Sequence, residues 1–147
     1  MTAADLPVSF RPRRTRAVLI TLGVVMCAAV VANGLVLSGL GPGERASFVI
    51  TGLLFLAGSL LLSRPKVTAD ATGVTVTNLT TVRHLEWPEI VRVNLRQGDP
   101  WVHLDLADGT SMPAMGIQPG IAKQQAIADA TRLRALVERH GSASHTG

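Results

Sequence analysis

Two pairs of side chains form the only arrangement in the sequence that suggests metal binding. His84 and Glu86 are two residues apart, as are His103 and Asp105, and this spacing places both members of a pair on one face of a β-strand. A metal site needs these ligands to converge on one point. Another predicted strand separates the two pairs, and histidine beside carboxylate is ordinary on a solvated face. We therefore predict no metal site and no cofactor.

Motifs of the common enzyme classes are absent from the sequence. It contains no G-x-S-x-G, H-E-x-x-H, P-loop, C-x-x-C or G-x-G-x-x-G motif. The single cysteine, Cys27, lies in an apolar run and has no partner for a disulfide within the chain. The protein is therefore not expected to be an enzyme.

Basic residues give the chain a formal net charge of +4, and their positions decide which partners they suit. Residues 64–147 carry nine Lys or Arg against eight Asp or Glu, so the excess comes mainly from the first 16 residues. Binding a nucleic-acid backbone needs several cations on one face, and we predict no such binding. The four arginines of the N-terminal segment instead precede an apolar run, where they would determine topology and attract anionic lipid. They are Arg11, Arg13, Arg14 and Arg16.

Two long apolar runs follow this basic segment (residues 1–16). The chain of 147 residues is 47% hydrophobic and 16% charged, against about 25% charged in an ordinary soluble domain. Residues 17–43 and 46–63 contain no Asp, Glu, Lys or Arg. The first run predicts a bilayer-spanning helix over 17–40, and the second, over 46–63, is near the short limit for a span. We predict a transmembrane hairpin over 17–63, which excludes a purely soluble protein.

Alternatives to the hairpin are a cleaved signal peptide, which would need a shorter apolar region and an A-x-A site, and a re-entrant or interfacial second segment. Small residues on the first helix would let another helix approach closely, in the hairpin or in an oligomer. They are Gly23, Ala28, Ala29, Ala32 and Gly34.

Positive charge in the short flanks predicts the topology. The four arginines precede the first helix and Arg64 and Lys66 follow the second, whereas the connecting loop holds only Arg45 beside Glu44. Both termini are therefore expected in the cytoplasm, in a multi-pass protein of the cell (inner) membrane.

From Lys66 onward, short runs of alternating apolar residues are divided by turn residues, which is typical of an antiparallel sheet. Six strands are predicted. The clearest covers 101–106, with its apolar residues facing the core: Val102, Leu104 and Leu106. In the strand over 90–96, one face is expected to carry Val91, Val93 and Leu95.

A helix over about 121–139 follows the strands and would cover the open end of a small curved sheet, giving an α+β fold. Its apolar stripe has helical spacing and consists of Ala126, Ala130, Leu133 and Val137, widened by Ile127 and Leu136. Gly141 is expected to cap the helix, and residues 142–147 form a tail.

Several local features between Arg64 and His140 resemble a known family. They are Arg64-Pro65-Lys66-Val67, Asp70 to Gly73, Glu86-Trp87-Pro88-Glu89-Ile90, the Asp108-Gly109 hairpin and the terminal helix. Together they resemble a bacterial pleckstrin-homology (PH) domain, most similar to the membrane-tethered actinobacterial type found in low-molecular-weight antigen 6-like proteins. The resemblance implies that the two-helix transmembrane hairpin precedes a PH-like antiparallel β-barrel or sandwich over 64–141, capped by the C-terminal helix.

Four residues of this domain are candidates for contact with a partner or with lipid. Trp101 lies on the polar face of its strand, and aromatic residues are enriched where proteins bind each other. The cations Lys66, Arg92 and Arg96 are scattered over separate strands. Trp87, in contrast, is expected in the core.

These features predict a membrane-anchored, cytoplasmic, non-catalytic module that acts as a protein-interaction or scaffold domain. Its partners would be the lipid bilayer and a protein bound at an edge strand or beside the helix. The alternatives are a lipid-binding sensor of the inner leaflet and an accessory subunit of a membrane transport or cell-envelope complex.

Overall fold

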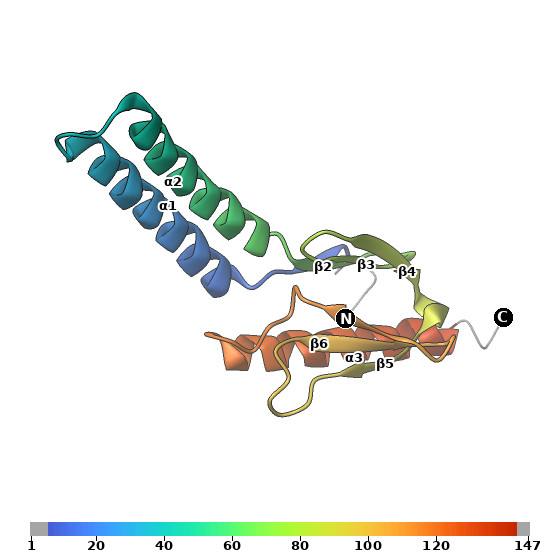
Figure 1. Ribbon diagram of the computed structural model, residues 1–147. Coiled ribbons are helices and arrows are strands. Elements are labelled where there is room, and N and C mark those ends of the chain that lie inside the picture. Colours follow the sequence, from blue (N-terminus) through green and yellow to red (C-terminus); the bar gives the residue numbers. More distant parts are fainter. Residues whose placement is uncertain (1–5, 144–147) are drawn as a thin grey trace. The chain divides into compact units, whose positions relative to one another are not determined.

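The computed structural model describes residues 6–143, and the side chains of residues 6–141. The chain forms two compact units (Figure 1): a helical hairpin over Arg13–Ser63, and a domain made from the residues up to Pro12 and those from Arg64 onward. The elements are, in order, β1 (Val8–Phe10), α1 (Arg13–Val36), α2 (Pro42–Leu62), β2 (Lys66–Ala69), β3 (Gly73–Thr77), β4 (Val82–Glu86), the 3-10 helix η2 (Trp87–Glu89), β5 (Ile90–Asn94), β6 (Val102–Leu106), β7 (Ser111–Ala114) and α3 (Lys123–Ala143). This architecture confirms the predicted α+β fold.

The domain is assembled from two separate stretches of chain, because β1 precedes the hairpin and pairs with β2, which follows it. The antiparallel register aligns Val8 with Ala69 and Phe10 with Val67. Val8 and Phe10 are buried in the core. Sequence analysis missed β1 because three residues are too few for an alternating pattern to be recognised. The helical hairpin is therefore inserted between two neighbouring strands of one domain.

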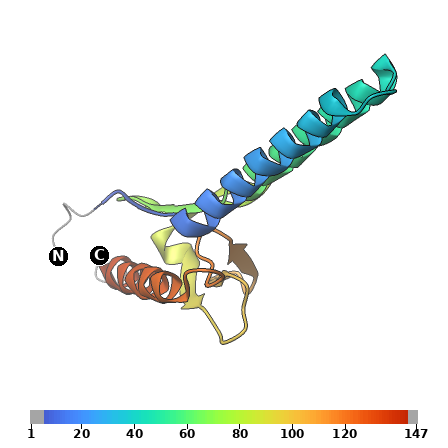
Figure 2. The ribbon, with the colours of Figure 1, turned by 90° about the vertical axis from the view of Figure 1, so that its left-hand side faces the viewer.

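Two antiparallel sheets enclose the core of the domain. One has the strand order β1-β2-β3-β4 and the other β5-β6-β7. In both views the second sheet and α3 lie on the same side of the first sheet (Figure 1 and Figure 2). The inward residues alternate along the strands as predicted, and those buried completely include Val67, Val74, Leu85, Val102 and Leu104.

The strand β5 departs from the predicted alternation. The register with β6 shifts between Ile90 and Arg92, which is the mark of a β-bulge. Ile90 and Val93 are buried as a result, whereas Val91 is 63% exposed. The prediction that Val91 shares one face with Val93 and Leu95 was wrong, because the bulge inserts an extra residue between Ile90 and Val93 and interrupts the alternation.

The helix α3 buries most of its predicted stripe against the sheets. The buried residues are Ala126, Ala130, Leu133, Leu136 and Val137. Two predictions for this helix were wrong. Ile127 is exposed, since it lies about 100° around the helix from Ala126. Gly141 does not cap the helix, which continues to Ala143.

A side chain from α3 also occupies a backbone acceptor of the edge strand β5. The guanidinium group of Arg134 donates to the carbonyl oxygen of Val93, with Nη2 at 3.1 Å and Nε at 3.4 Å. An unpaired strand edge otherwise attracts another strand. The helix therefore satisfies a backbone acceptor that would be available at a free edge.

The helices of the hairpin are each long and apolar enough to cross a membrane. They have 24 and 21 residues, and only 11% and 6% of their most apolar windows are buried. This exposure is unlike that of a core helix in a soluble protein, and it indicates membrane association. The second helix begins at Pro42 rather than at residue 46, so its length of about 31 Å, at 1.5 Å per residue, matches a bilayer core.

Glycines allow α1 and α2 to pack closely. A Cβ atom on Gly23 would lie 2.5 Å from Cβ of Ser59, and one on Gly34 would lie 2.5 Å from Cβ of Phe48. Backbones approach at such positions because glycine has no side chain. The other small residues predicted for helix pairing are exposed: Ala28, Ala29 and Ala32.

The charged pair that sequence analysis placed in the connecting loop lies in the first turn of α2 and satisfies backbone groups at this end of the hairpin. The Arg45 guanidinium donates to the carbonyl oxygens of Leu35 and Leu40, each at 3.3 Å. The Glu44 carboxylate accepts the N–H of Gly41 at 2.8 Å. Both charges thus stabilise the turn of the hairpin, where helix ends leave unpaired backbone groups.

Candidate functional site

The structure separates the four residues predicted to contact a partner or lipid. Lys66 lies on β2 in the four-stranded sheet. Arg92 lies on β5, Arg96 follows that strand, and Trp101 directly precedes β6. The three cations therefore do not form a single basic pocket.

A polar cavity of about 310 Å³ lies along β5, β6 and β7. The residues that line it are Asn94, Arg96, Asp99, His103, Asp105 and Ser111. Asn94 donates from Nδ2 to Oδ2 of Asp105, and Oδ2 of Asp99 accepts the backbone N–H of Arg96 at 2.9 Å. Both carboxylates thus hold local structure. Arg96 is the only residue of this cavity that was predicted to contact a partner.

The two histidine–carboxylate pairs lie in different sheets, His84 on β4 and His103 on β6. The His84 ring is within hydrogen-bonding distance of two hydroxyls, with Nδ1 3.0 Å from Oγ1 of Thr75 and Nε2 3.3 Å from Oγ1 of Thr72. Among the residues that the structure describes, no group of three or more His, Cys, Asp or Glu is arranged to hold a metal ion.

Asp70 forms a tight turn next to His84. Its Oδ1 accepts hydrogen bonds from the Thr72 hydroxyl at 2.6 Å, the Thr72 N–H at 2.8 Å and the Gly73 N–H at 3.0 Å. These bonds, above all the one from the Thr72 hydroxyl, lower the pKa of Asp70 below its ordinary 3.8. The turn at 70–73 is therefore held by the ionised carboxylate.

The lowered pKa of Asp70 predicts how stability depends on pH. A carboxyl whose pKa is lower in the folded state contributes stability above its unfolded pKa, and that contribution is lost as the pH falls through the folded value. Unfolding followed by fluorescence should show this loss below pH 3.8. In Asp70→Asn the loss of stability at low pH should be smaller but still present. A second carboxyl, that of Asp108, also has a lowered pKa because it accepts hydrogen bonds from Thr110. An unchanged pH profile in Asp70→Asn would contradict this role.

The two tryptophans of the chain have different environments. Trp87 is 4% exposed, as predicted for a core residue. Its Nε1 donates to the carbonyl oxygen of Asp70 at 3.1 Å, and its ring stacks on His140 with centroids 4.4 Å apart. Trp101 is half-buried, and its Nε1 is buried with no hydrogen-bond partner in the described part of the chain.

This difference predicts opposite responses to the same substitution. Trp87→Phe leaves the carbonyl of Asp70 without its donor and should lower the free energy of unfolding by about 1–3 kcal/mol. Trp101→Phe removes a donor that has no partner, so stability should stay within about 0.5 kcal/mol or rise. Urea denaturation of both variants measures the difference. A larger loss in Trp101→Phe would show that its N–H has a partner in solution.

A groove of about 370 Å³ separates the loop after β5 from the start of α3, and we call it the loop–helix groove. It is lined by Leu95, Arg96, Gln97, Gly98, Asp99, Pro119, Lys123 and Ile127. Apolar side chains line part of it, and two cations flank them. It shares Arg96 and Asp99 with the polar cavity.

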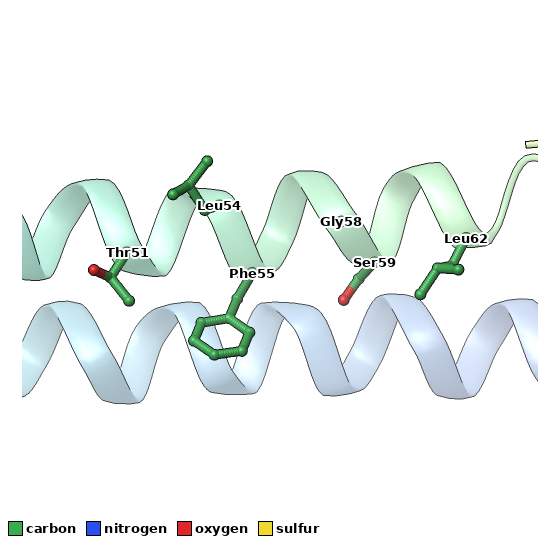
Figure 3. Close-up of a pocket in the computed structure, with 6 residues that line it drawn as sticks. All are labelled: Thr51, Leu54, Phe55, Gly58, Ser59 and Leu62. Atoms are coloured by element: carbon green, nitrogen blue, oxygen red, sulfur yellow. The ribbon is translucent and has the colours of Figure 1, made fainter. Parts of the chain in front are cut away.

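The hairpin carries a third concavity, on α2, which we call the α2 groove (Figure 3). Its lining residues are Thr51, Leu54, Phe55, Gly58, Ser59 and Leu62, and its volume is about 460 Å³. Thr51, Phe55, Ser59 and Leu62 lie on the side toward α1, whereas Leu54 projects away from it. The groove is largely apolar, and it lies on a helix that is exposed in the structure.

Comparison with known proteins identifies the domain. The model of the bacterial PH domain family matches residues 64–136. The chain belongs to the bacterial PH domain family. Its relatives include the uncharacterized protein Rv1417 of Mycobacterium tuberculosis and the uncharacterized protein Mb1452 of Mycobacterium bovis. Each is 31% identical over 148 residues, covering 95% of this chain and 96% of the relative. No solved structure matches the chain.

Within the PH domain, one buried polar residue that sequence analysis did not single out links the two sheets. Asn78 follows β3, and its Nδ2 donates to the carbonyl oxygen of Pro113 at 2.9 Å while its Oδ1 accepts the N–H of Met115 at 3.0 Å. Pro113 lies on β7 of the other sheet. Only the tertiary fold brings these segments together, so the sequence offers no signal for this role beyond a polar residue after a strand.

Proposed function

We propose that this protein is a two-pass membrane protein whose PH domain lies at the cytoplasmic surface and serves as a non-catalytic interaction or scaffold module. The single observation that carries the proposal is the pairing of β1 with β2 across the inserted hairpin. A strand before the first helix and a strand after the second belong to one sheet, which supports an even number of membrane crossings.

The short connections between the hairpin and the PH domain support a position of the domain close to the bilayer. Only Arg11 and Pro12 lie between β1 and α1, and only residues 63–65 lie between α2 and β2. Such short linkers leave the domain little freedom to move away from the helices. A module held in this way would present its surface to proteins in or next to the membrane.

The distribution of positive charge at the ends of the hairpin supports a cytoplasmic location for the domain. Arg13, Arg14 and Arg16 lie in the first turns of α1, and Arg64 follows α2. At the opposite end of the hairpin, Arg45 lies in the first turn of α2 beside Glu44 and is paired with backbone carbonyls. Cationic flanks remain on the cytoplasmic side of membranes. Both termini are therefore proposed to be cytoplasmic.

Two engineered cysteines test this orientation in a Cys27→Ala background. Ser38→Cys lies between the helices and Gln97→Cys lies in the loop after β5; both positions are exposed. A membrane-impermeant maleimide added to intact cells should label the first and not the second, and both should react after the membrane is opened. Labelling of Gln97→Cys in intact cells would reverse the proposed topology.

The structure limits where a partner strand could be added. At the outer edge of β5, Arg134 already occupies the carbonyl of Val93, which makes strand addition less favourable there. The edge strand β4 has exposed residues at Val82, Arg83 and His84. Strand addition at β4 and docking in the loop–helix groove are the routes to a protein partner that the surface supports.

Affinity capture from native membranes tests the scaffold function. The intact protein is compared with a form that lacks the domain (residues 6–12 and 64–143) and with a form whose hairpin is replaced by an unrelated two-span hairpin. The scaffold function predicts partners that survive the hairpin exchange and disappear with the domain. Failure to recover a specific partner with the intact protein would contradict it.

The α2 groove favours a second function, an accessory subunit whose hairpin packs in a larger membrane complex. An apolar concavity with Gly58 at its surface suits close approach by a third helix. Gly58→Leu should then release membrane proteins that co-purify, whereas Ala57→Leu, at an exposed position outside the groove, should retain them. The lipid-sensor alternative has less support, because Lys66 lies on a different sheet from Arg92.

A further inference from the structure

The loop–helix groove combines an apolar surface with two unpaired cations. Leu95, Pro119 and Ile127 supply the apolar part, and Ile127 is 42% exposed although it lies on a helix packed on the core. Within the part of the chain that the structure describes, the Arg96 guanidinium and the Lys123 ammonium have no hydrogen-bond or ion-pair partner. A single exposed isoleucine is ordinary on a protein surface. Here, however, Ile127 lines a groove together with two unpaired cations, and this combination makes the groove a candidate for binding.

The charge of the groove selects an anionic occupant. Asp99 is its single acid, and the carboxylate is already bound to the backbone N–H of Arg96 at 2.9 Å. The two cations therefore outnumber the acid, and neither is engaged. Carboxylates are strong partners for arginine and lysine, since both partners of such hydrogen bonds are charged.

The size of the groove limits how much of a partner can enter. A volume of about 370 Å³ is at the low end of the range for ligand pockets, about 300–1,000 Å³. This space accommodates one or two side chains and not a folded surface. Arg134 already occupies the carbonyl oxygen of Val93 on the neighbouring strand β5. A partner strand there would lose that hydrogen bond, so we expect the occupant to gain its affinity mainly from side chains.

We propose that the loop–helix groove binds an acidic peptide segment of a protein partner, with an apolar side chain against Leu95, Pro119 and Ile127 and its carboxylates on Arg96 and Lys123. This inference deepens the proposed scaffold function and rests on it. Ile121, which is 57% exposed just before α3, lies near enough along the chain to extend the apolar contact.

Binding is measured by NMR from the chemical shifts of the isoleucine methyl groups, because the six isoleucines of the chain lie in distinct regions. The full chain, methyl-labelled at isoleucine, is placed in nanodiscs of neutral phosphatidylcholine. The probe is a degenerate peptide mixture with two Asp or Glu beside one Leu, Ile or Phe. The comparison mixture carries Asn and Gln in place of the acids. We expect saturable shifts at Ile127 and Ile121, and none at the buried Ile90 or at Ile50 of the hairpin.

Charge variants test whether the two cations carry the binding. Arg96→Gln combined with Lys123→Gln should weaken binding of the acidic mixture by about tenfold or more, since a hydrogen bond to a charged group is typically worth that factor. The matched control, Arg132→Gln combined with Arg139→Gln, removes the same charge from exposed positions of α3 outside the groove and should bind as the parent does.

Three outcomes would overturn the proposal: no shift at Ile127 with the acidic mixture, equal shifts with the amide mixture, or equal affinity in the Arg96→Gln/Lys123→Gln variant. Nanodiscs with phosphatidylglycerol and no peptide form a further arm. Shifts at Ile127 there, with none from peptide, would assign the groove to the lipid surface. If a protein partner is captured from membranes and the Arg96→Gln/Lys123→Gln variant still binds it, the scaffold function stands and the loop–helix groove is not its binding site.

Discussion

Replacing Phe10 with alanine is expected to lower the free energy of unfolding of the PH domain by about 3–5 kcal/mol. Phe10 is 3% exposed and belongs to the core, although the hairpin separates it from the rest of the domain in sequence. Its loss removes a large buried side chain and leaves a cavity in the core. Both tryptophans lie in the domain, so fluorescence during denaturation in mild detergent reports on the domain and not on the hairpin.

Ser9→Ala is the matched control for this substitution. Ser9 lies on the same short strand, but its side chain is exposed, and exposed substitutions usually change stability by no more than about 0.5 kcal/mol. A similar loss in both variants, or no loss in either, would mean that β1 does not contribute to the core in solution.

Replacing Trp87 with alanine should have an effect of the same size, a loss of about 3–5 kcal/mol. The substitution removes the core side chain itself, the hydrogen bond from Nε1 to the carbonyl oxygen of Asp70, and the stacking on His140. Circular dichroism during thermal unfolding measures the change, since the variant retains only one tryptophan.

Two further variants show which interaction of Trp87 matters most. His140→Ala keeps Trp87 but removes the stacking, together with the contact of His140 Nδ1 with the carbonyl oxygen of Leu136 at 2.9 Å. It should cost about 0.5–1.5 kcal/mol, by analogy with pairs of aromatic rings. Trp101→Ala removes the other tryptophan, which is half-buried, and should cost less than Trp87→Ala. A larger loss at Trp101 than at Trp87 would contradict the position assigned to Trp87.

Alternation and hydropathy were sufficient to predict much of the fold. The strand β6 was predicted correctly, because Val102, Leu104 and Leu106 alternate with polar residues over its whole length. The apolar helices were also predicted, since a long run without charged residues is typical of a membrane-spanning helix. The strand β1 and the exposure of Val91 could not be predicted, because a three-residue strand and a bulge depend on pairing with distant strands.

The candidate site was less predictable than the fold. Arg96 was selected for its charge, and the structure places it between the polar cavity and the loop–helix groove. Lys123 and Pro119 of the groove lie more than twenty residues away in sequence, and no local pattern joins them to Arg96. Such a site arises from the packing of α3 beside the loop after β5, which sequence periodicity does not encode.

A disulfide between β1 and β2 tests most directly that the hairpin is inserted between paired strands of one domain. Ser9 and Thr68 are register partners, and directly opposed residues of antiparallel strands have Cα atoms about 4.5–5.5 Å apart, a distance that a disulfide can bridge. In a Cys27→Ala background, Ser9→Cys with Thr68→Cys should crosslink on mild oxidation in native membranes. The control pairs Ser9→Cys with Thr75→Cys, one strand further away on β3, and should remain reduced. Absence of the Ser9–Thr68 crosslink, or equal crosslinking in the control, would contradict the insertion of the hairpin between paired strands.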